Sequence, residues 1–163
     1  MASEFVSFMI LFSIGMVFLV GINITITSIE DNLRDNIIDL QLESVCNKVK
    51  DNIVSGFEIY NWHFTNNDYF HYDSEIELPR LVGKRYSYEI IISTDVFGNY
   101  RILGKLTNSE NILINMSIPL SSDSSDHSIK ISGTFQSILP YHTLTFQKNG
   151  LNPIEIDLLS KSS

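Results

Sequence analysis

The feature that most constrains this chain is an uncharged run of 25 residues near its start, positions 5–29. Within it, residues 5–22 (FVSFMILFSIGMVFLVGI) hold 14 apolar residues, two serines and two glycines. A helix rises about 1.5 Å per residue, so about 20 residues cross the ~30 Å hydrocarbon layer of a bilayer. The run predicts a transmembrane helix over residues 1–29 and excludes a single soluble globule.

Two other interpretations of this run are weaker. A cleaved signal peptide would show a basic start, a shorter apolar stretch and a small-residue cleavage site, and the sequence has none of these. A buried core helix that is apolar on all faces would need a much larger protein around it. We therefore expect a permanent single-pass anchor in the cell membrane, in contact with lipid.

Charge is distributed unevenly along the 163 residues, whose net charge is −8. Glu4 is the one ionisable residue among the first 29, and the other 29 of the 30 Asp, Glu, Lys and Arg residues lie in the following 134. Charged residues therefore make up about 22% of these 134 residues, which is typical of a soluble domain. The acidity argues against a nucleic-acid partner, and the single cysteine, Cys46, excludes a disulfide-stapled miniprotein.

The helical period continues beyond the uncharged run. No proline interrupts residues 2–55, and Gly56 is a natural helix end. We predict one helix over residues 3–55 whose second part, residues 30–56, is amphipathic. Its expected apolar stripe consists of Ile29, Leu33, Ile37, Leu40, Val45, Val49 and Ile53. The C-terminal domain, neighbouring copies of the helix, or both would cover this stripe.

From residue 57 onward, short runs rich in β-branched and aromatic residues replace the helical period. We predict an α+β fold in which the long helix is followed by an antiparallel β-sandwich-like or small-barrel head over residues 57–163. The expected strands are residues 57–64, 86–94, 100–106, 112–118, 128–135, 142–148 and 154–159. Residues 66–77 fit less well and are either a long loop or an edge strand.

The sequence contains no established catalytic or cofactor motif, so we expect no enzyme activity and no cofactor. The four histidines, at positions 63, 71, 127 and 142, are scattered singly, which argues against a metal site. Residues 121–126 lack the glycine and distal glutamate of a calcium loop. An anchored enzyme would require convergent carboxylates or a histidine pair in a pocket.

Three other features have both a structural and a functional interpretation. Cys46 is better explained as a small core residue than as a reactive thiol. The aromatic side chains of residues 60–72 form either the junction of helix and sheet, which we favour, or a surface for a glycan or protein partner. The basic residues within positions 80–85 are either solvated or in contact with acidic lipid headgroups or an acidic neighbour. The aromatic residues of positions 60–72 considered above are Tyr60, Trp62, Phe64, Tyr69, Phe70 and Tyr72.

The orientation of the chain is argued from its polar C-terminal domain, because neither flank of the uncharged run is basic. We place that domain outside the cell, where the sequon at Asn115 is a candidate glycosylation site. A second sequon, at Asn23, lies too near the bilayer. Chance occurrence of both sequons in an Asn- and Ser-rich chain is the alternative.

Glu4 needs a physical reason, since a carboxylate at the start of a membrane helix is costly. Either the helix N-terminus stabilises it at the headgroup level, or it pairs with the terminal amine of an adjacent subunit.

The start of the chain resembles the N-termini of archaeal type IV pilin-like surface proteins. The matching residues are Ala2-Ser3-Glu4-Phe5-Val6-Ser7-Phe8, then Ile10-Leu11-Phe12 and Gly15. They repeat that family's Ser-Glu pair and its aliphatic stretch with Phe and Gly. Archaellum stator subunits are similar in plan, with one membrane helix and an external β-sandwich. The resemblance covers the first 55 residues in pattern and the remainder in fold class.

This resemblance implies a non-enzymatic subunit of a pilus-like or archaellum-like filament, with copies of itself or other pilin-like subunits as partners. It assigns assembly roles to Glu4, Phe5, Phe8, Phe12 and Gly15. Glu4 falls one place before the family's usual fifth position, with no basic leader ahead of it. Either a leader is missing, the start is misassigned, or the protein is an unprocessed relative such as a stator or minor component.

The alternative function is a monomeric anchored module whose head binds a glycan, an S-layer or a protein. In that case a chain that begins near residue 57 would keep its binding, whereas the head of an assembly subunit would be inert alone.

Overall fold

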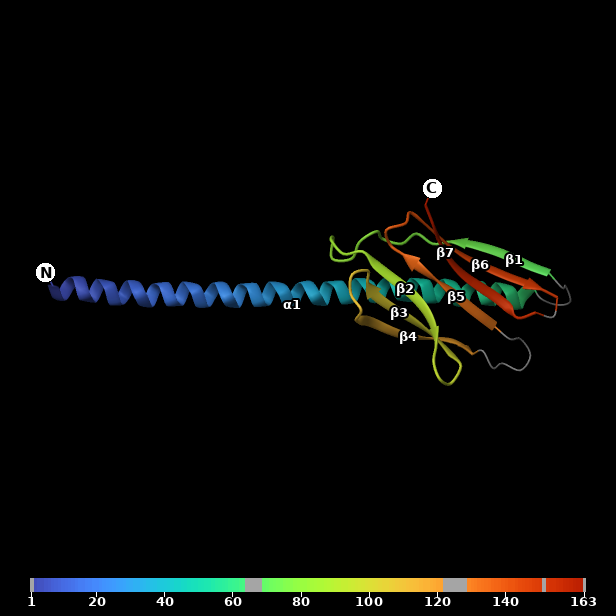
Figure 1. Cartoon of the computed structure of the whole chain (residues 1–163), viewed down its shortest axis with the longest axis horizontal. Coiled ribbons are helices and arrows are strands. Elements are labelled where there is room, and N and C mark those ends of the chain that lie inside the picture. The colour runs from blue at the N-terminus through green and yellow to red at the C-terminus, as the bar shows by residue number, and fades with distance from the viewer. Residues whose placement is uncertain (1, 64–68, 122–128, 151, 163) are drawn as a thin grey trace. The chain divides into compact units, whose positions relative to one another are not determined.

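A computed structural model describes residues 2–63, 69–121, 129–150 and 152–162 of the chain. One long helix is followed by seven strands (Figure 1). The elements are α1 (Ala2–His63), β1 (Tyr69–Glu75), β2 (Tyr88–Thr94), β3 (Asn99–Leu106), β4 (Ile112–Ser121), β5 (Ile129–Gln136), β6 (Tyr141–Asn149) and β7 (Ile154–Lys161). Contacts between Cα atoms divide the chain into two compact units, Met1–Ile37 and Ile38–Ser163.

The predicted continuous helix is confirmed, but its predicted end is wrong. α1 continues through residues 57–63, where a strand was expected. Phe64, the last residue of that expected strand, lies outside the described residues. The reason is that Ile53, Gly56 and Tyr60 follow one another at spacings of three and four and are all buried, so the helical period outweighs the β-propensity of the aromatic residues.

The strands form a single seven-stranded sheet in the order β1-β6-β7-β5-β2-β3-β4. All neighbouring pairs are antiparallel except β5 and β7, which run parallel, so the prediction of a wholly antiparallel head is wrong. The described strands form this one sheet where a sandwich of two was expected. Six predicted strands are confirmed with their bounds shifted by a few residues, and β1, within residues 66–77, is an edge strand.

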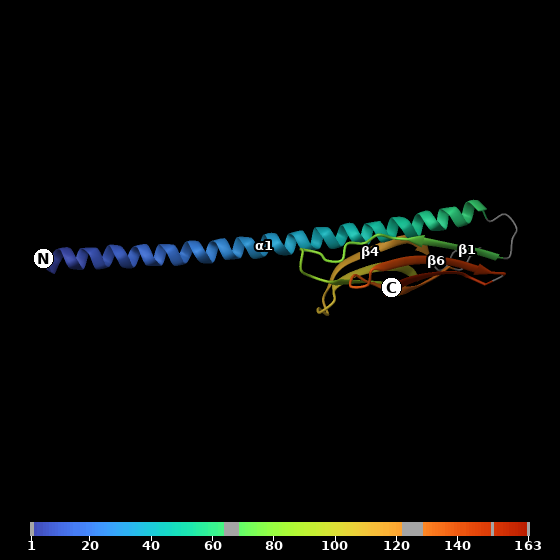
Figure 2. The same ribbon diagram turned by 90° about the horizontal axis from the view of Figure 1, so that it is seen from above.

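The head is a two-layer structure in which residues 38–63 of α1 lie along one face of the sheet (Figure 2). Along the strands, buried and exposed side chains alternate, with Tyr88, Ile90 and Ile92 of β2 as an example. The helix contributes Ile38, Leu42, Val45, Cys46, Val49, Ile53 and Tyr60 to the same core. Each buried aliphatic side chain contributes roughly 1.5–3 kcal/mol, so the sheet depends on this part of α1 for its stability.

Hydrogen bonds fasten the helix to the rest of the head at both ends of this contact. Lys48 Nζ donates to the Glu77 carbonyl oxygen at 2.6 Å, and the Gly83 N–H donates to Gln41 Oε1 at 2.7 Å. At the far end, Lys148 Nζ on β6 donates to the Tyr60 hydroxyl at 3.0 Å. Such bonds contribute about 1 kcal/mol each and fix the register of helix and sheet.

Candidate assembly surface on the N-terminal helix

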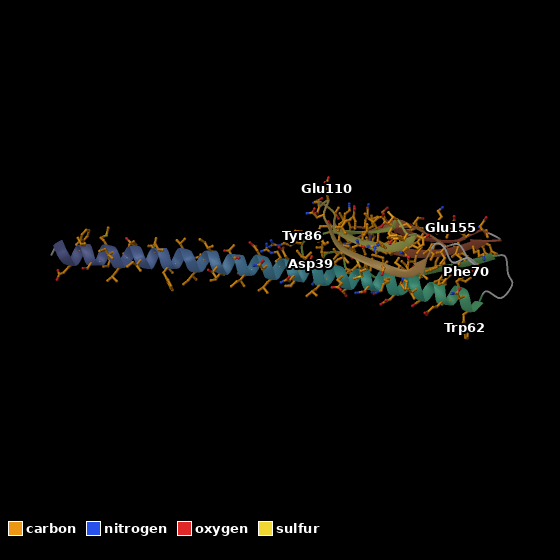
Figure 3. All side chains as sticks on the ribbon, turned by 90° about the horizontal axis from the view of Figure 1, so that it is seen from below. Asp39, Trp62, Phe70, Tyr86, Glu110 and Glu155 are labelled. Carbon is orange, nitrogen blue, oxygen red and sulfur yellow. The ribbon has the colours of Figure 1, made fainter. Side chains whose placement is uncertain are left out.

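Over residues 4–37, α1 carries apolar side chains on every side, and none of the side chains described there is buried (Figure 3). Its most apolar 18-residue window has a mean hydropathy of 2.6. Within the described residues, α1 is the one helix long and apolar enough to cross a membrane. An exposed apolar surface of this length requires a lipid or protein environment.

The polar side chains of this segment hydrogen-bond to the helix itself. Ser13 Oγ donates to the Met9 carbonyl oxygen at 2.8 Å, and Thr25 Oγ1 donates to that of Gly21 at 2.9 Å. Asn23 Nδ2 donates in the same way, at 3.1 Å, to the carbonyl oxygen four residues earlier. Polar groups satisfied within the helix are compatible with hydrocarbon. The same bond occupies the amide nitrogen of the Asn23 sequon.

Four of the five predicted assembly residues share one side of α1. Glu4, Phe8, Phe12 and Gly15 follow at spacings of four, four and three, which a 3.6-residue period places one above another. The rings of Phe8 and Phe12 are stacked with centroids 6.4 Å apart. A Cβ at Gly15 would meet nothing within 4 Å, so the helix surface is flat there. The glycine in this row allows close approach of a second helix.

Phe5, the fifth predicted assembly residue, is also exposed but lies to one side of this row. Glu4 lies in the first turn of α1, where the partial positive charge of the helix N-terminus stabilises a carboxylate. This position is compatible with both interpretations of Glu4, stabilisation by the helix N-terminus and pairing with the terminal amine of an adjacent subunit.

The prediction of one apolar stripe along α1 is wrong, because the stripe is divided into an exposed part and a buried part. Val45, Val49 and Ile53 are buried against the sheet, whereas the earlier members remain exposed. Leu40 is 66% exposed and Leu42, two residues later, is fully buried. The step of five from Leu40 to Val45 rotates the stripe by roughly 140° at about 100° per residue. The exposed stripe consists of Ile29, Leu33, Ile37 and Leu40.

Asn115, the candidate glycosylation site, is exposed on the edge strand β4. Its Oδ1 accepts a hydrogen bond from Arg101 Nη1 at 3.3 Å, which leaves Nδ2 directed to the other side of the amide group. The structure does not test whether it is modified, so glycosylation stays a prediction.

The interpretation of Cys46 as a core residue is confirmed, since its thiol is fully buried. Burial, with a contribution from the Glu43 carboxylate, raises the pKa of this thiol to about 12. His142 is buried beside Phe135 and has Nε2 3.0 Å from the Gln136 carbonyl oxygen. Among the described residues no three His, Cys, Asp or Glu side chains gather around one point. Residues 122–127, with the predicted solvated loop and His127, lie outside the described part of the chain.

The aromatic residues near the helix end divide into core and surface. Tyr60 is buried and meets Phe70 edge-on with ring centroids 5.3 Å apart, and Tyr72 packs against Phe146. Tyr60, Phe70 and Tyr72 therefore form the predicted junction of helix and sheet. Trp62 is exposed and points away from the sheet in Figure 3. Tyr69 is exposed on β1.

The β2–β3 hairpin tip is a surface feature that the sequence reasoning missed. Val96 is 92% exposed and Phe97 is 79% exposed, although both are apolar. The N–H groups of Phe97 and Asn99 each donate to Asp95 Oδ1 at 2.9 Å, which holds the turn in one shape. These bonds, that of Asn99 above all, keep the pKa of Asp95 below its usual range. The signal was the run Asp95 to Asn99, an Asp-x-x-Gly-Asn turn with apolar residues at its tip.

No protein-family model, curated protein or solved structure is detectably similar to this chain. The geometry is therefore the basis for any functional conclusion. It offers surfaces suited to association: the apolar part of α1, the exposed stripe after it and the hairpin tip.

Proposed function

We propose that the chain is a non-enzymatic, membrane-anchored subunit of a type IV pilus-like or archaellum-like assembly at the cell surface. The first part of α1 spans the membrane once and associates with copies of itself or with other pilin-like subunits. The head, with Asn115, lies outside the cell.

One observation carries the proposal: the same helix is exposed and largely apolar over residues 5–22 and contributes to the core of the head from Ile38 onward. One element, α1, therefore contributes both the exposed apolar segment and part of the core of the head. The row of Glu4, Phe8, Phe12 and Gly15 supplies a side on which a second helix fits.

The proposal is tested by co-isolation of two differently tagged full-length chains from native membranes in mild detergent. We expect the wild-type chains to co-isolate, and Gly15→Leu to reduce the yield because its side chain separates the helices. Gly21→Leu, the same substitution about 120° around α1 from Gly15, is the matched control and keeps the wild-type yield. Wild-type chains that isolate free of each other and of other surface subunits would contradict the proposal.

A second candidate function, an anchored binding module, is favoured by the hairpin tip. Val96 and Phe97 are held in the open by Asp95, as in a preorganised contact for a protein, glycan or S-layer partner. A chain beginning near residue 57 cannot test it, since that truncation removes the helix residues of the core. A chain beginning at Glu30 keeps the whole unit Ile38–Ser163. If this chain binds isolated cell envelopes and Phe97→Ser abolishes the binding, the module function is supported over assembly.

A further inference from the structure

The two edge strands of the sheet, β1 and β4, run in opposite directions (Figure 1). Five of the six neighbouring strand pairs are antiparallel, and the pair of β5 and β7 is parallel. An odd number of reversals therefore leads from β1 to β4. In consequence, β4 of a second head with the same orientation has the direction needed to continue the sheet as an antiparallel neighbour of β1.

β1 presents free backbone groups at its outer edge. The Ile76 N–H donates to the carbonyl oxygen of His142, its opposite residue on β6, at 2.9 Å. Because hydrogen bonds in an antiparallel pair join every second residue, Tyr72 and the alternate residues on either side of it bond to β6. The N–H and C=O groups of His71 and Asp73 then point away from the sheet, and no backbone group in the described part of the chain bonds to them.

The β1 edge lacks the features that usually prevent an edge strand from pairing. Its seven residues pair with β6 without a register shift, and none of them is proline, lysine or arginine. β4, in contrast, has two register shifts against β3 and contains Pro119. Residues 114–117 form the regular run between these shifts. The structure thus offers one unprotected edge and one edge that is open over a short run.

The regular run of β4 also presents free backbone groups. The Thr107 N–H donates to the Ser87 carbonyl oxygen at 3.0 Å, so the odd-numbered residues of β3 bond to β2 and the even-numbered ones bond to β4. Met116 is the partner of one of these even-numbered residues. Asn115 and Ser117, on either side of Met116, therefore direct their N–H and C=O groups outward, and both side chains are exposed.

The two edges carry opposite charges on the face of the sheet that points away from α1. Asp73 and Glu75 are exposed on β1, where His71 Nε2 lies 3.2 Å from Asp73 Oδ2. β4 contains no acidic residue, and Arg101 of the adjacent strand β3 donates to Asn115 Oδ1 at 3.3 Å. The Arg101 side chain, which also pairs with Asp95, is 42% exposed. The β1 edge is therefore acidic and the β4 edge basic.

We propose that β1 of one copy pairs with β4 of the next copy, so that the heads form a row with a continuous sheet. Centring residues 114–117 on β1 places His71 opposite Ser117 and Asp73 opposite Asn115. These two pairs supply up to four backbone hydrogen bonds. The Asp73 carboxylate then lies beside the Arg101 guanidinium of the neighbouring head, where the opposite charges attract.

The inference rests on the proposed function, because it names a contact between heads of subunits that already associate through the N-terminal part of α1. Four hydrogen bonds of about 1 kcal/mol each form a weak contact between free heads. Association through the helices raises the effective concentration of the edges and makes such a contact sufficient. A head-to-tail contact of this kind does not close, so the row extends as copies are added.

A second copy fits the β1 edge better than an unrelated extended peptide does. β4 supplies the required direction, polar side chains on one face and the half-buried Ile114 and Met116 on the other, beside Tyr72 of β1. Copies joined in this way share one orientation, so Ile38 of every head lies on the same side of the row. Pairing of two β1 strands would reverse one head relative to the other.

The experiment uses full-length chains in native membranes, with His71→Cys in one tagged copy and Ser117→Cys in a differently tagged copy. Both positions are exposed, and the native thiol of Cys46 is buried. Opposite residues that exchange hydrogen bonds have Cα atoms about 5.5 Å apart, which a disulfide can bridge. We expect a disulfide between the two tags under mild oxidation.

Three pairs of variants are the controls for this disulfide. Two copies that both carry His71→Cys, or both carry Ser117→Cys, should give none, because neither strand pairs with itself. His71→Cys with Lys130→Cys should also give none, since Lys130 is exposed on β5 in the interior of the sheet. These pairs measure random collision between exposed thiols.

Asp73→Pro, added to the copy with His71→Cys, tests the backbone pairing. It removes an N–H that faces away from β6, so the hydrogen bonds within the head remain. Asp73→Thr is the matched control, because it also lacks the carboxylate but keeps the N–H. We expect Asp73→Pro to give about fivefold less disulfide than Asp73→Thr, the ratio that one hydrogen bond provides. Resistance of Cys46 to iodoacetamide shows that both heads are folded.

Three results would overturn the inference and identify what occupies the edges instead. A disulfide between two copies that carry His71→Cys would show that β1 pairs with itself. A glycan on Asn115 of every wild-type copy, found by mass spectrometry, would show that the β4 edge is covered. Loss of another protein from the isolated chain on Asp73→Pro, without any disulfide between copies, would identify that protein as the partner of β1.

Two further results would refute the contact itself. Equal yields for Asp73→Pro and Asp73→Thr would exclude backbone pairing. Absence of the disulfide, while wild-type chains co-isolate and Gly15→Leu reduces their yield, would refute the edge contact and leave the proposed function standing. Wild-type chains that do not co-isolate would contradict the proposed function first, and the inference with it.

Discussion

Gly56 of α1 and Phe146 of β6 are in such close contact that no larger residue fits at the helix position. A Cβ at residue 56 would lie 2.2 Å from Cζ of the Phe146 ring, where ordinary contacts exceed 3 Å. The sequence alone suggested that this glycine ends the helix. Its role is instead to bring the helix against the sheet, so the last turn of α1 belongs to the core.

Gly56→Ala is predicted to destabilise the head by roughly 1–3 kcal/mol, the usual cost of overpacking. The measurement is urea unfolding of a chain that begins at Glu30. Ser55→Ala, at the exposed neighbouring position, is the matched control and is expected to stay within about 0.5 kcal/mol of wild type. Combining Gly56→Ala with Phe146→Leu should cost less than the two single changes added together. Equal stability of Gly56→Ala and wild type would contradict the contact.

Leu40 and Leu42 are predicted to differ in their effect on the stability of the head. Leu42→Ala removes a fully buried side chain and should lower the free energy of unfolding by about 2–5 kcal/mol. Leu40→Ala changes an exposed side chain and should change it by less than about 0.5 kcal/mol. Unfolding in urea measures both. A large loss at Leu40 with none at Leu42 would mean that the helix faces the sheet with its other side.

Asp95 is predicted to make the head less stable in acid. Its pKa is lower in the folded protein than in the unfolded chain, because the Asn99 N–H and its other donors stabilise the carboxylate. The resulting stabilisation is present above the unfolded value, about 3.9, and is lost as pH falls through the folded value. Unfolding measured from pH 7 to pH 2 should show wild type more stable than Asp95→Asn at neutral pH. The two should converge below about pH 4, and a constant difference would contradict the account.

Cys46 is predicted to be unreactive while the head is folded. Its pKa of about 12 leaves almost no thiolate at pH 8, and burial excludes reagents. Iodoacetamide should modify it only after denaturation, as measured by mass spectrometry. Leu81→Cys, an exposed thiol in the same chain, is the positive control. Rapid alkylation of Cys46 in the native protein would show that α1 leaves the sheet readily.

The sequence was most informative where one period persisted. The uninterrupted helix and six strands follow from apolar spacing and from turn residues such as Gly98-Asn99. The aromatic residues at 57–63 were misassigned because their composition favours strands, although Gly56 and Tyr60 continue the buried side of the helix.

Long-range pairing was beyond the sequence. β5 and β6 are joined by a short turn and look like a hairpin, yet β7 lies between them and runs parallel to β5. That arrangement depends on Gly133, whose missing Cβ would lie 2.3 Å from the Leu158 carbonyl oxygen. The break of the helix stripe between Leu40 and Val45 was likewise missed. These two residues are five apart, and a step of five places them about 140° apart around the helix.

The sequence analysis named the individual assembly residues of α1 but did not state which of them share one side of the helix. The row on α1 was named from resemblance, and its common side follows from helical spacing. The hairpin tip became a candidate when exposure and hydrogen bonds were visible.

The central claim, association through the membrane part of α1, is tested most directly by a cysteine scan over residues 5–22 in native membranes. Each full-length variant carries one new cysteine, and disulfide formation between copies is measured under mild oxidation. The account predicts yields that rise and fall with a period of about 3.6 residues, with maxima at Phe8, Phe12 and Gly15. Uniformly absent cross-links, or yields without a helical period, would contradict it.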